Sequence, residues 1–170
     1  MSHSNDDRMK NMVLAVDLMF KALDDRAIDK VFFQFETDPT FKYIFPTTWR
    51  ELEQRYLIKV ERMMGGSLCQ LTGYGWRTAV DDFWDELEPK LGPMMSKVAA
   101  SLKDFVKGRN EDAYVYLDSL AAGSGVPEDI VFNIIESEIL DLRFNMKGAR
   151  WHEGHAPLIH VPLDFGLAPL

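Results

Sequence analysis

The sequence predicts a mainly α-helical protein with short β-hairpins, and two patterns lead to that fold class. Apolar residues recur at spacings of three and four along several segments, as on the buried face of an amphipathic helix. Between and after these segments lie short runs rich in β-branched and aromatic residues, which are typical of strands. With 170 residues, 46% apolar and 27% charged, the chain suits one folded domain or two small ones.

The N-terminal part is predicted to begin with a helix over residues 9–23, where apolar side chains follow the helical spacing. The β-branched and aromatic run at residues 28–35 fits either a strand or an extension of this helix, because a short apolar run does not reveal its own secondary structure. Pro39 and Pro46 predict irregular chain after it, since the residue before a proline is kept out of the helical region.

The second helix is predicted from a capping pattern. Thr48 and Glu51 have the spacing of a capping box, in which each side chain satisfies a free backbone amide at a helix start. A helix is therefore expected over residues 49–63, ended by the glycine pair that follows it. Residues 67–71 then fit a strand.

Two more helices complete the first part of the chain. Thr72 is expected to cap a helix that reaches Leu87 and stops between Pro89 and Pro93, because proline lacks the N–H group that a helix needs. A fourth helix follows over residues 94–107. The break between them divides the chain into predicted units of residues 1–92 and 93–170.

The second half begins with a β-prone run at residues 113–117. Asp118 is expected to cap the short helix that follows, and Gly125 to end it. Pro127 then opens a long helix that continues to Leu142, since proline is favoured in the first turn.

The chain is predicted to end in two strands, residues 149–151 and 158–161, joined by a loop and ended by Pro162. After the fourth helix, the order is therefore strand, short helix, glycine turn, long helix and hairpin. This layout is similar to that of the winged helix-turn-helix family.

The run LDSLAAGSGVPEDIV, residues 117–131, resembles the central segment of that family. The resemblance implies that Ala121 faces the next helix closely, that Gly125 takes the turn, and that Val126, Val131 and Ile134 fill the core between the helices. It covers residues 94–161, and the first half resembles a degenerate copy of the same plan. A tandem winged-helix protein is therefore expected.

The family reads DNA with the long helix, which implies cationic or amide side chains on its exposed face. Between Pro127 and Leu142 the polar positions are neutral or acidic, and carboxylates are repelled by phosphates. An alternative is that this helix and the apolar hairpin bind a protein partner, so that replacing Glu136 would weaken contact with a basic partner. The partner-binding candidates are Glu128, Asn133, Glu136 and Asp141.

Cationic residues suited to DNA phosphates lie elsewhere. Arg55, Lys59 and Arg62 recur at i, i+4 and i+7 and would form one stripe on the second helix. The alternative is a solvated helix face whose cations pair with Glu51, Glu53 and Glu61. Cations after the long helix would contact phosphates or stabilise the negative end of that helix. The DNA-binding candidates are Arg50, Arg55, Lys59, Arg62, Arg143, Lys147 and Arg150.

Enzymatic activity and a cofactor are not expected, because the sequence carries no Ser/His/Asp grouping, phosphate loop or dinucleotide glycine pattern. His152, His155 and His160 are the best metal ligands, but a loop bearing Gly and Pro lacks the rigidity of a helical metal motif, so no metal is predicted. A metal-dependent hydrolase using Asp82 and Glu88 is the third hypothesis.

Cellular location and partners follow from composition. Cys69 is the single cysteine and cannot form an internal disulfide, which indicates a reducing compartment. No apolar run approaches the roughly 20 residues of a membrane helix, so a cytoplasmic location is expected. The net charge of −8 repels phosphate polymers on average.

The sequence thus predicts a non-enzymatic winged-helix protein that serves as a DNA-associated regulator or as an accessory subunit of a DNA-processing complex. The expected partners are double-stranded DNA, another protein or a second copy of the chain. The alternative is a protein-interaction module or scaffold that does not bind DNA.

Overall fold

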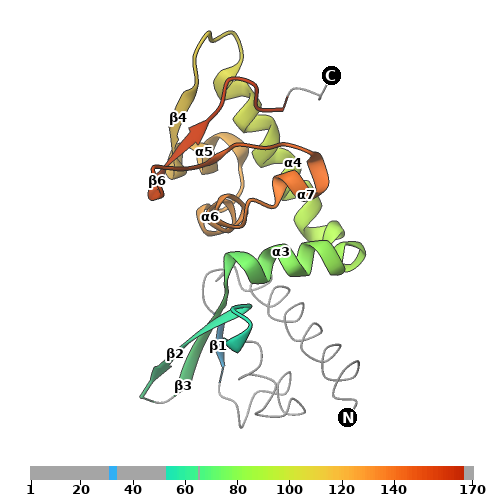
Figure 1. Ribbon diagram of the computed structural model, residues 1–170, viewed down its shortest axis with the longest axis vertical. Coiled ribbons are helices and arrows are strands. Elements are labelled where there is room, and N and C mark those ends of the chain that lie inside the picture. Colours follow the sequence, from blue (N-terminus) through green and yellow to red (C-terminus); the bar gives the residue numbers. More distant parts are fainter. Residues whose placement is uncertain (1–30, 34–52, 65, 167–170) are drawn as a thin grey trace. The chain divides into compact units, whose positions relative to one another are not determined.

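The structure is a computed structural model that describes residues 31–33, 53–64 and 66–166 (Figure 1). The chain divides into two compact units, Met1–Phe83 and Trp84–Leu170. Both contain helices and a small antiparallel sheet in the part that is described. The predicted first helix, the Thr48–Glu51 capping pair and the irregular chain around Pro39 and Pro46 lie outside the described residues.

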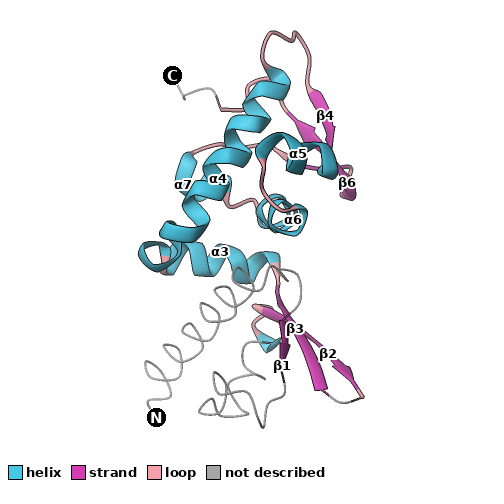
Figure 2. Ribbon diagram, turned by 180° about the vertical axis from the view of Figure 1, so that it is seen from behind, coloured by secondary structure: helices cyan, strands magenta, loops and turns pink. Residues whose placement is uncertain are grey.

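Unit 1 contains a three-stranded sheet with the order β1-β3-β2 (Figure 2). Its strands are β1 (Val31–Phe33), β2 (Ile58–Met63) and β3 (Gly66–Leu71), all antiparallel to their neighbours. The strand predicted at residues 67–71 is confirmed. The ambiguous run at residues 28–35 is a strand over the part that is described.

The helix predicted over residues 49–63 is wrong over residues 58–63, which form β2, whereas residues 53–54 are helical. Ile58 is buried and Lys59 is exposed, which is the alternation of a strand with one covered face. Antiparallel pairing with β3 satisfies the backbone groups that a helix would have bonded internally. The expected cationic stripe therefore does not form on a helix.

Helix α3 (Gly73–Asp82) begins at Thr72 as predicted, since the Thr72 hydroxyl accepts a hydrogen bond from Gly75 N at 3.0 Å. The same hydroxyl donates to the backbone carbonyl of Tyr56, and Thr72 N donates to Leu57 O at 3.1 Å. These bonds tie the start of α3 to the chain before β2. The helix ends at Phe83, earlier than the predicted Leu87.

Helix α4 (Trp84–Val106) continues through Pro89 and Pro93, where the sequence predicted a stop. Both prolines are exposed, so the backbone hydrogen bond that each proline cannot donate is lost on the solvent side of the helix. Apolar residues recur at helical spacing before and after them, and their burial offsets a cost of about 3 kcal/mol per proline. The buried set is Leu87, Leu91, Met95, Val98 and Leu102. The unit boundary consequently falls at Phe83 and not at residue 92.

Unit 2 continues with β4 (Ala113–Tyr116), α5 (Leu117–Ser124), α6 (Glu128–Ser137), α7 (Leu140–Phe144), β5 (Arg150–His152) and β6 (His155–Val161). Its strands form an antiparallel sheet with the order β4-β6-β5. Helix α5 packs against both α4 and α6. The buried core includes Leu102, Val115, Leu120, Ile130, Val131, Ile134, Ile159 and Val161. This arrangement is compatible with a winged-helix-like unit.

In the connection between α5 and α6, the glycine turn is the one that the sequence predicted. The residues at the N-cap positions of α5 and α6 differ from the prediction. Gly125 ends α5 in the left-handed conformation, with φ 70° and its N–H bonded to Ala121 O at 2.9 Å. Tyr116, not Asp118, occupies the N-cap position of α5, and the Asp118 carboxylate accepts a hydrogen bond from Ser119 N. Pro127 precedes α6 and so lies one position before the predicted one. The expected core residues Val126, Val131 and Ile134 are buried.

The predicted long helix is interrupted after Ser137. The Ser137 hydroxyl donates to the carbonyl of Asn133, and Glu138 adopts φ 52°, in the left-handed region. The chain then re-enters a helix as α7, with Ile139 and Leu140 both buried. The Glu138 N–H bonds to Ile135 O at 3.1 Å, which ends α6 at this left-handed residue.

The final hairpin is tighter than predicted. Strands β5 and β6 are joined by Glu153 and Gly154, whose φ angles of 48° and 76° are those of a two-residue type I′ turn. Pro162 follows the end of β6, as expected. Within the described part of the chain, no helix combines the length and apolar character that crossing a membrane requires.

Candidate functional site

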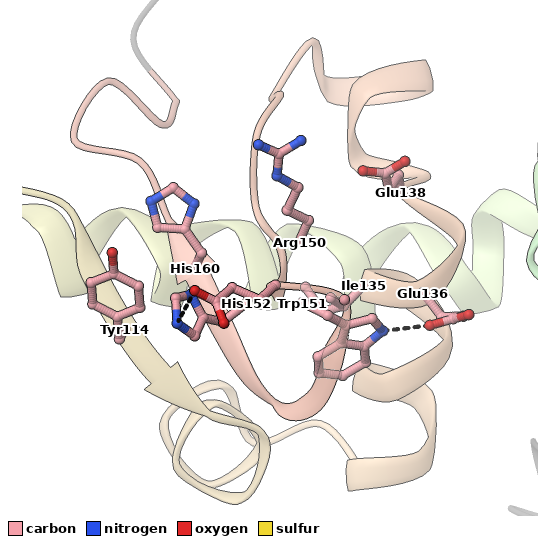
Figure 3. A pocket seen from close by; sticks show the side chains of 10 residues that line it. Tyr114, Ile135, Glu136, Glu138, Arg150, Trp151, His152 and His160 are labelled. Carbon is pink, nitrogen blue, oxygen red and sulfur yellow. Dashed lines mark hydrogen bonds and ion pairs between the residues drawn. The ribbon is translucent and has the colours of Figure 1, made fainter.

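An open groove of about 670 Å³ lies in unit 2 between the sheet and the C-terminal end of α6 (Figure 3). The hairpin and β4 supply one wall and α6 supplies the other. The groove is lined by Tyr114, Ile135, Glu136, Glu138, Arg150, Trp151, His152, Glu153, Gly154 and His160. It combines aromatic rings with charges of both signs.

The sheet positions one row of polar and aromatic side chains in this groove. Tyr114 pairs with His160, and His160 pairs with Arg150, so the three residues form a cross-strand row. The Tyr114 ring lies 5.3 Å from the His160 ring and 4.9 Å, edge-on, from the His152 ring. Figure 3 shows both imidazoles beside Tyr114 and the Arg150 guanidinium between His160 and Glu138.

Trp151 connects the hairpin to α6. Its indole ring packs against Phe132 with a centroid distance of 5.2 Å, and its N–H donates to the Glu136 carboxylate. A buried or half-buried indole N–H needs such an acceptor. Glu136 therefore holds Trp151 in place at one side of the groove.

Asp112 and His160 form a pair at the opposite side. The imidazole Nε2 lies 2.8 Å from Asp112 Oδ2, and Leu163 N donates to Oδ1 of the same carboxylate at 2.8 Å. The Asp112 pKa is lowered from its ordinary 3.8, first by the hydrogen bond from Leu163 N and then by the bond with His160. No Ser, Thr or Cys side chain in the described residues bonds to His160, so the pair lacks the nucleophile of a hydrolytic triad.

We expect Asp112→Asn to lower the melting temperature at neutral pH and to have a smaller effect as the pH falls below about 4. The folded-state pKa of Asp112 is below the unfolded value, so its charged form stabilises the fold above the unfolded pKa. That contribution is lost as the pH falls through the folded pKa. Melting curves of both proteins between about pH 2 and pH 7 measure it, and a difference independent of pH would contradict this prediction.

The structure places the first-half DNA candidates on irregular chain and on a strand. Arg55 is exposed in the turn before β2, and Lys59 is exposed on β2, where its ammonium lies 4.0 Å from the Glu61 carboxylate. Arg62 also belongs to β2, and Arg50 lies outside the described residues. Arg55, Lys59 and Arg62 are therefore not on one helix.

The second-half DNA candidates differ in what they contact. The Arg143 guanidinium, in the last turn of α7, lies 5.2 Å from the centre of the Trp84 ring, which indicates a cation–π contact. Lys147 is exposed and lines a second, smaller pocket, which Arg150 also lines. Arg150 alone of the three lines the large groove.

Two of the four partner-binding candidates have internal roles. Asn133 is buried, and its side-chain amide donates to Asp129 O at 2.8 Å, so its expected place on a partner surface is wrong. Glu136 lines the groove but accepts the Trp151 indole N–H. Glu128 is exposed at the start of α6, and Asp141 is half-buried in α7.

The three histidines considered as metal ligands, His152, His155 and His160, lie on the hairpin of β5 and β6. The His152 imidazole is 3.8 Å from the Glu153 carboxylate, His160 bonds to Asp112, and His155 is exposed. Among the described residues, no group of three or more His, Cys, Asp or Glu side chains is arranged to hold a metal ion.

The sequence patterns did not predict that Tyr114, Trp151 and Glu138 belong to a binding site. Tyr114 and Tyr116 are separated by a buried Val115, so the alternation in β4 already indicated two aromatic rings on the open face of a strand. No local pattern indicated Glu138, because the helical spacing of the apolar residues around it predicted a continuous helix there. Comparison of the chain with protein-family models, curated proteins and solved structures finds no significant match.

Proposed function

We propose that the protein is a non-enzymatic binding protein whose C-terminal unit, winged-helix-like in plan, receives a protein partner in the groove between the hairpin and α6. The observation that carries the proposal is the chemistry of α6. This helix contains no Arg or Lys, its one amide side chain, Asn133, is buried, and Glu128 is exposed at its start. A helix of this kind placed in the major groove would bring carboxylates to the phosphates.

The groove has the features of a protein-binding surface. Aromatic side chains contribute strongly to protein interfaces because they bury a large area at a low entropy cost. Tyr114, which lines the groove, is 55% exposed although it belongs to a strand of the core sheet. Trp151 is fixed by Phe132 and Glu136, so its ring is preorganised for a partner.

Position-specific photo-crosslinking tests this function. A photoreactive phenylalanine analogue replaces Tyr114 in one protein and Tyr74, an exposed tyrosine of α3, in a matched control. We expect a discrete protein adduct from position 114 in extracts of the source cells, none from position 74, and loss of the adduct when Trp151→Ala is added. The adduct is identified by mass spectrometry and reproduced with the purified partner; a second copy of the chain counts as that partner.

Two results would overturn the proposal. One is the absence of an adduct at position 114, or equal adducts at both positions. The other is saturable, salt-sensitive binding of labelled duplex DNA that is lost on changing Arg55 and Lys59, or Arg143, Lys147 and Arg150, to alanine. The second result would assign the protein to DNA association.

A further inference from the structure

We infer that the Arg150 guanidinium is the docking point for a carboxylate side chain of the partner. This inference rests on the proposed function and names the chemistry of the group that enters the groove. It differs from the expectation of a basic partner that the acidic helix suggested.

The charged groups in the groove differ in whether they have a partner within the protein. The Glu136 carboxylate accepts the Trp151 N–H, and the Glu153 carboxylate lies 3.8 Å from the His152 imidazole. Glu138 also has an interaction within the protein. The Arg150 side chain, in contrast, forms no hydrogen bond or ion pair in the described part of the chain. The groove therefore offers a cation, while its carboxylates already have partners.

The geometry of arginine selects the type of ligand. The guanidinium carries five N–H donors in a planar fork that matches the two oxygens of a carboxylate. Arg150 lies in one cross-strand row with His160 and Tyr114. The methylene groups of a glutamate bound to Arg150 would pack against these two rings. A glutamate would thus gain both a bidentate ion pair and packing against rings.

The surrounding charges favour a single carboxylate over a nucleic-acid backbone. Glu136, Glu138 and Glu153 line the same groove. A phosphate polymer carries a charge at every step and would approach all three carboxylates, whereas one side chain meets Arg150 alone. The net charge of −8 slows the approach of an acidic partner, but salt screens it beyond about 8 Å at physiological ionic strength.

Solution NMR on the full chain tests the inference, with the Arg150 Nε–H and Trp151 Nε1–H signals as reporters. The probes are a short glycine-rich peptide with two glutamates, the same peptide with two glutamines, and a short DNA duplex. We expect saturable shifts of both signals with the glutamate peptide and no comparable shift with the glutamine peptide. Arg150→Gln should weaken binding, followed at Trp151, by about tenfold or more, and Arg150→Lys by less.

Lys147→Gln is the matched control, because it removes the same charge at an exposed site outside the groove. It should leave glutamate-peptide binding within about twofold of wild type. Equal responses to both peptides, or equal losses from Arg150→Gln and Lys147→Gln, would overturn the inference. If the duplex binds more tightly than the glutamate peptide and its binding depends on Arg150, the inference is overturned. The ligand of Arg150 would then be a phosphate and not a carboxylate. A crosslinked partner at position 114 together with no response to the glutamate peptide would overturn this inference and leave the proposed function standing.

Discussion

Replacing Gly75 by alanine is expected to destabilise unit 1 by about 3 kcal/mol or more. An added Cβ would lie 2.0 Å from Leu57 O and 3.2 Å from the Leu71 side chain. Leu57 O already accepts the hydrogen bond from Thr72 N, so neither the strand nor the helix start can move without breaking it. The free energy of unfolding from urea titration measures the loss.

Gly92→Ala provides the matched control, since Gly92 is also a helical glycine. Its added Cβ would lie 3.1 Å from the Glu88 Cγ, which belongs to an exposed side chain that can rotate. Removing an interior helical glycine normally stabilises by about 0.5–1 kcal/mol, but Gly92 precedes Pro93, whose ring disfavours a helical residue that carries a Cβ. The two effects oppose each other, so Gly92→Ala should change the free energy of unfolding by less than about 1 kcal/mol. Similar losses from the two variants would show that the contact with Leu57 is not what requires glycine at position 75.

Replacing Ile134 by alanine is expected to cost unit 2 about 2–5 kcal/mol. Ile134 is 1% exposed and lies on α6 with Ile130 and Val131, which are equally buried. The substitution removes apolar surface and leaves a cavity that the close-packed neighbours fill only in part. Hydrogen exchange followed by mass spectrometry locates the effect, because amides of α5, α6 and β6 should lose protection.

A graded control accompanies this variant. Ile134→Val removes one methylene group and should cost only about 0.5–1.5 kcal/mol, with the same peptides affected to a smaller degree. Loss of protection confined to the β2–β3 hairpin, or equal effects of the two variants, would contradict the placement of Ile134 in the core of unit 2.

Local signals in the sequence predicted the features that depend on a few neighbouring residues. The Thr72 cap, the Gly125 turn and the end of the last strand at Pro162 were all predicted and confirmed. Each depends on the chemistry of one side chain or on one backbone angle. The buried positions Val131 and Ile134 also followed from helical spacing and the family resemblance.

Features decided by distant contacts were predicted less well. The run around Lys59 has charges at helical spacing and apolar residues at strand spacing, and pairing with β3 selects the strand. Helix α4 crosses Pro89 and Pro93 because buried side chains on both sides of them outweigh the lost hydrogen bonds. The break at Glu138, with its left-handed φ of 52°, lies inside a segment whose apolar residues keep helical spacing, so local spacing did not indicate it.

By itself, the sequence determined which segments favour helices or turns and where charged residues lie along the chain. Spacing and composition are properties of the chain alone. It contained Arg150 and Glu136 and predicted a phosphate contact for the first and a basic partner for the second, but it did not show which residues surround them in the fold. Only the tertiary structure decided that Glu136 holds Trp151 and that Arg150 has no internal partner. The reason is physical: whether a charge is satisfied depends on what the fold places within hydrogen-bond distance of it.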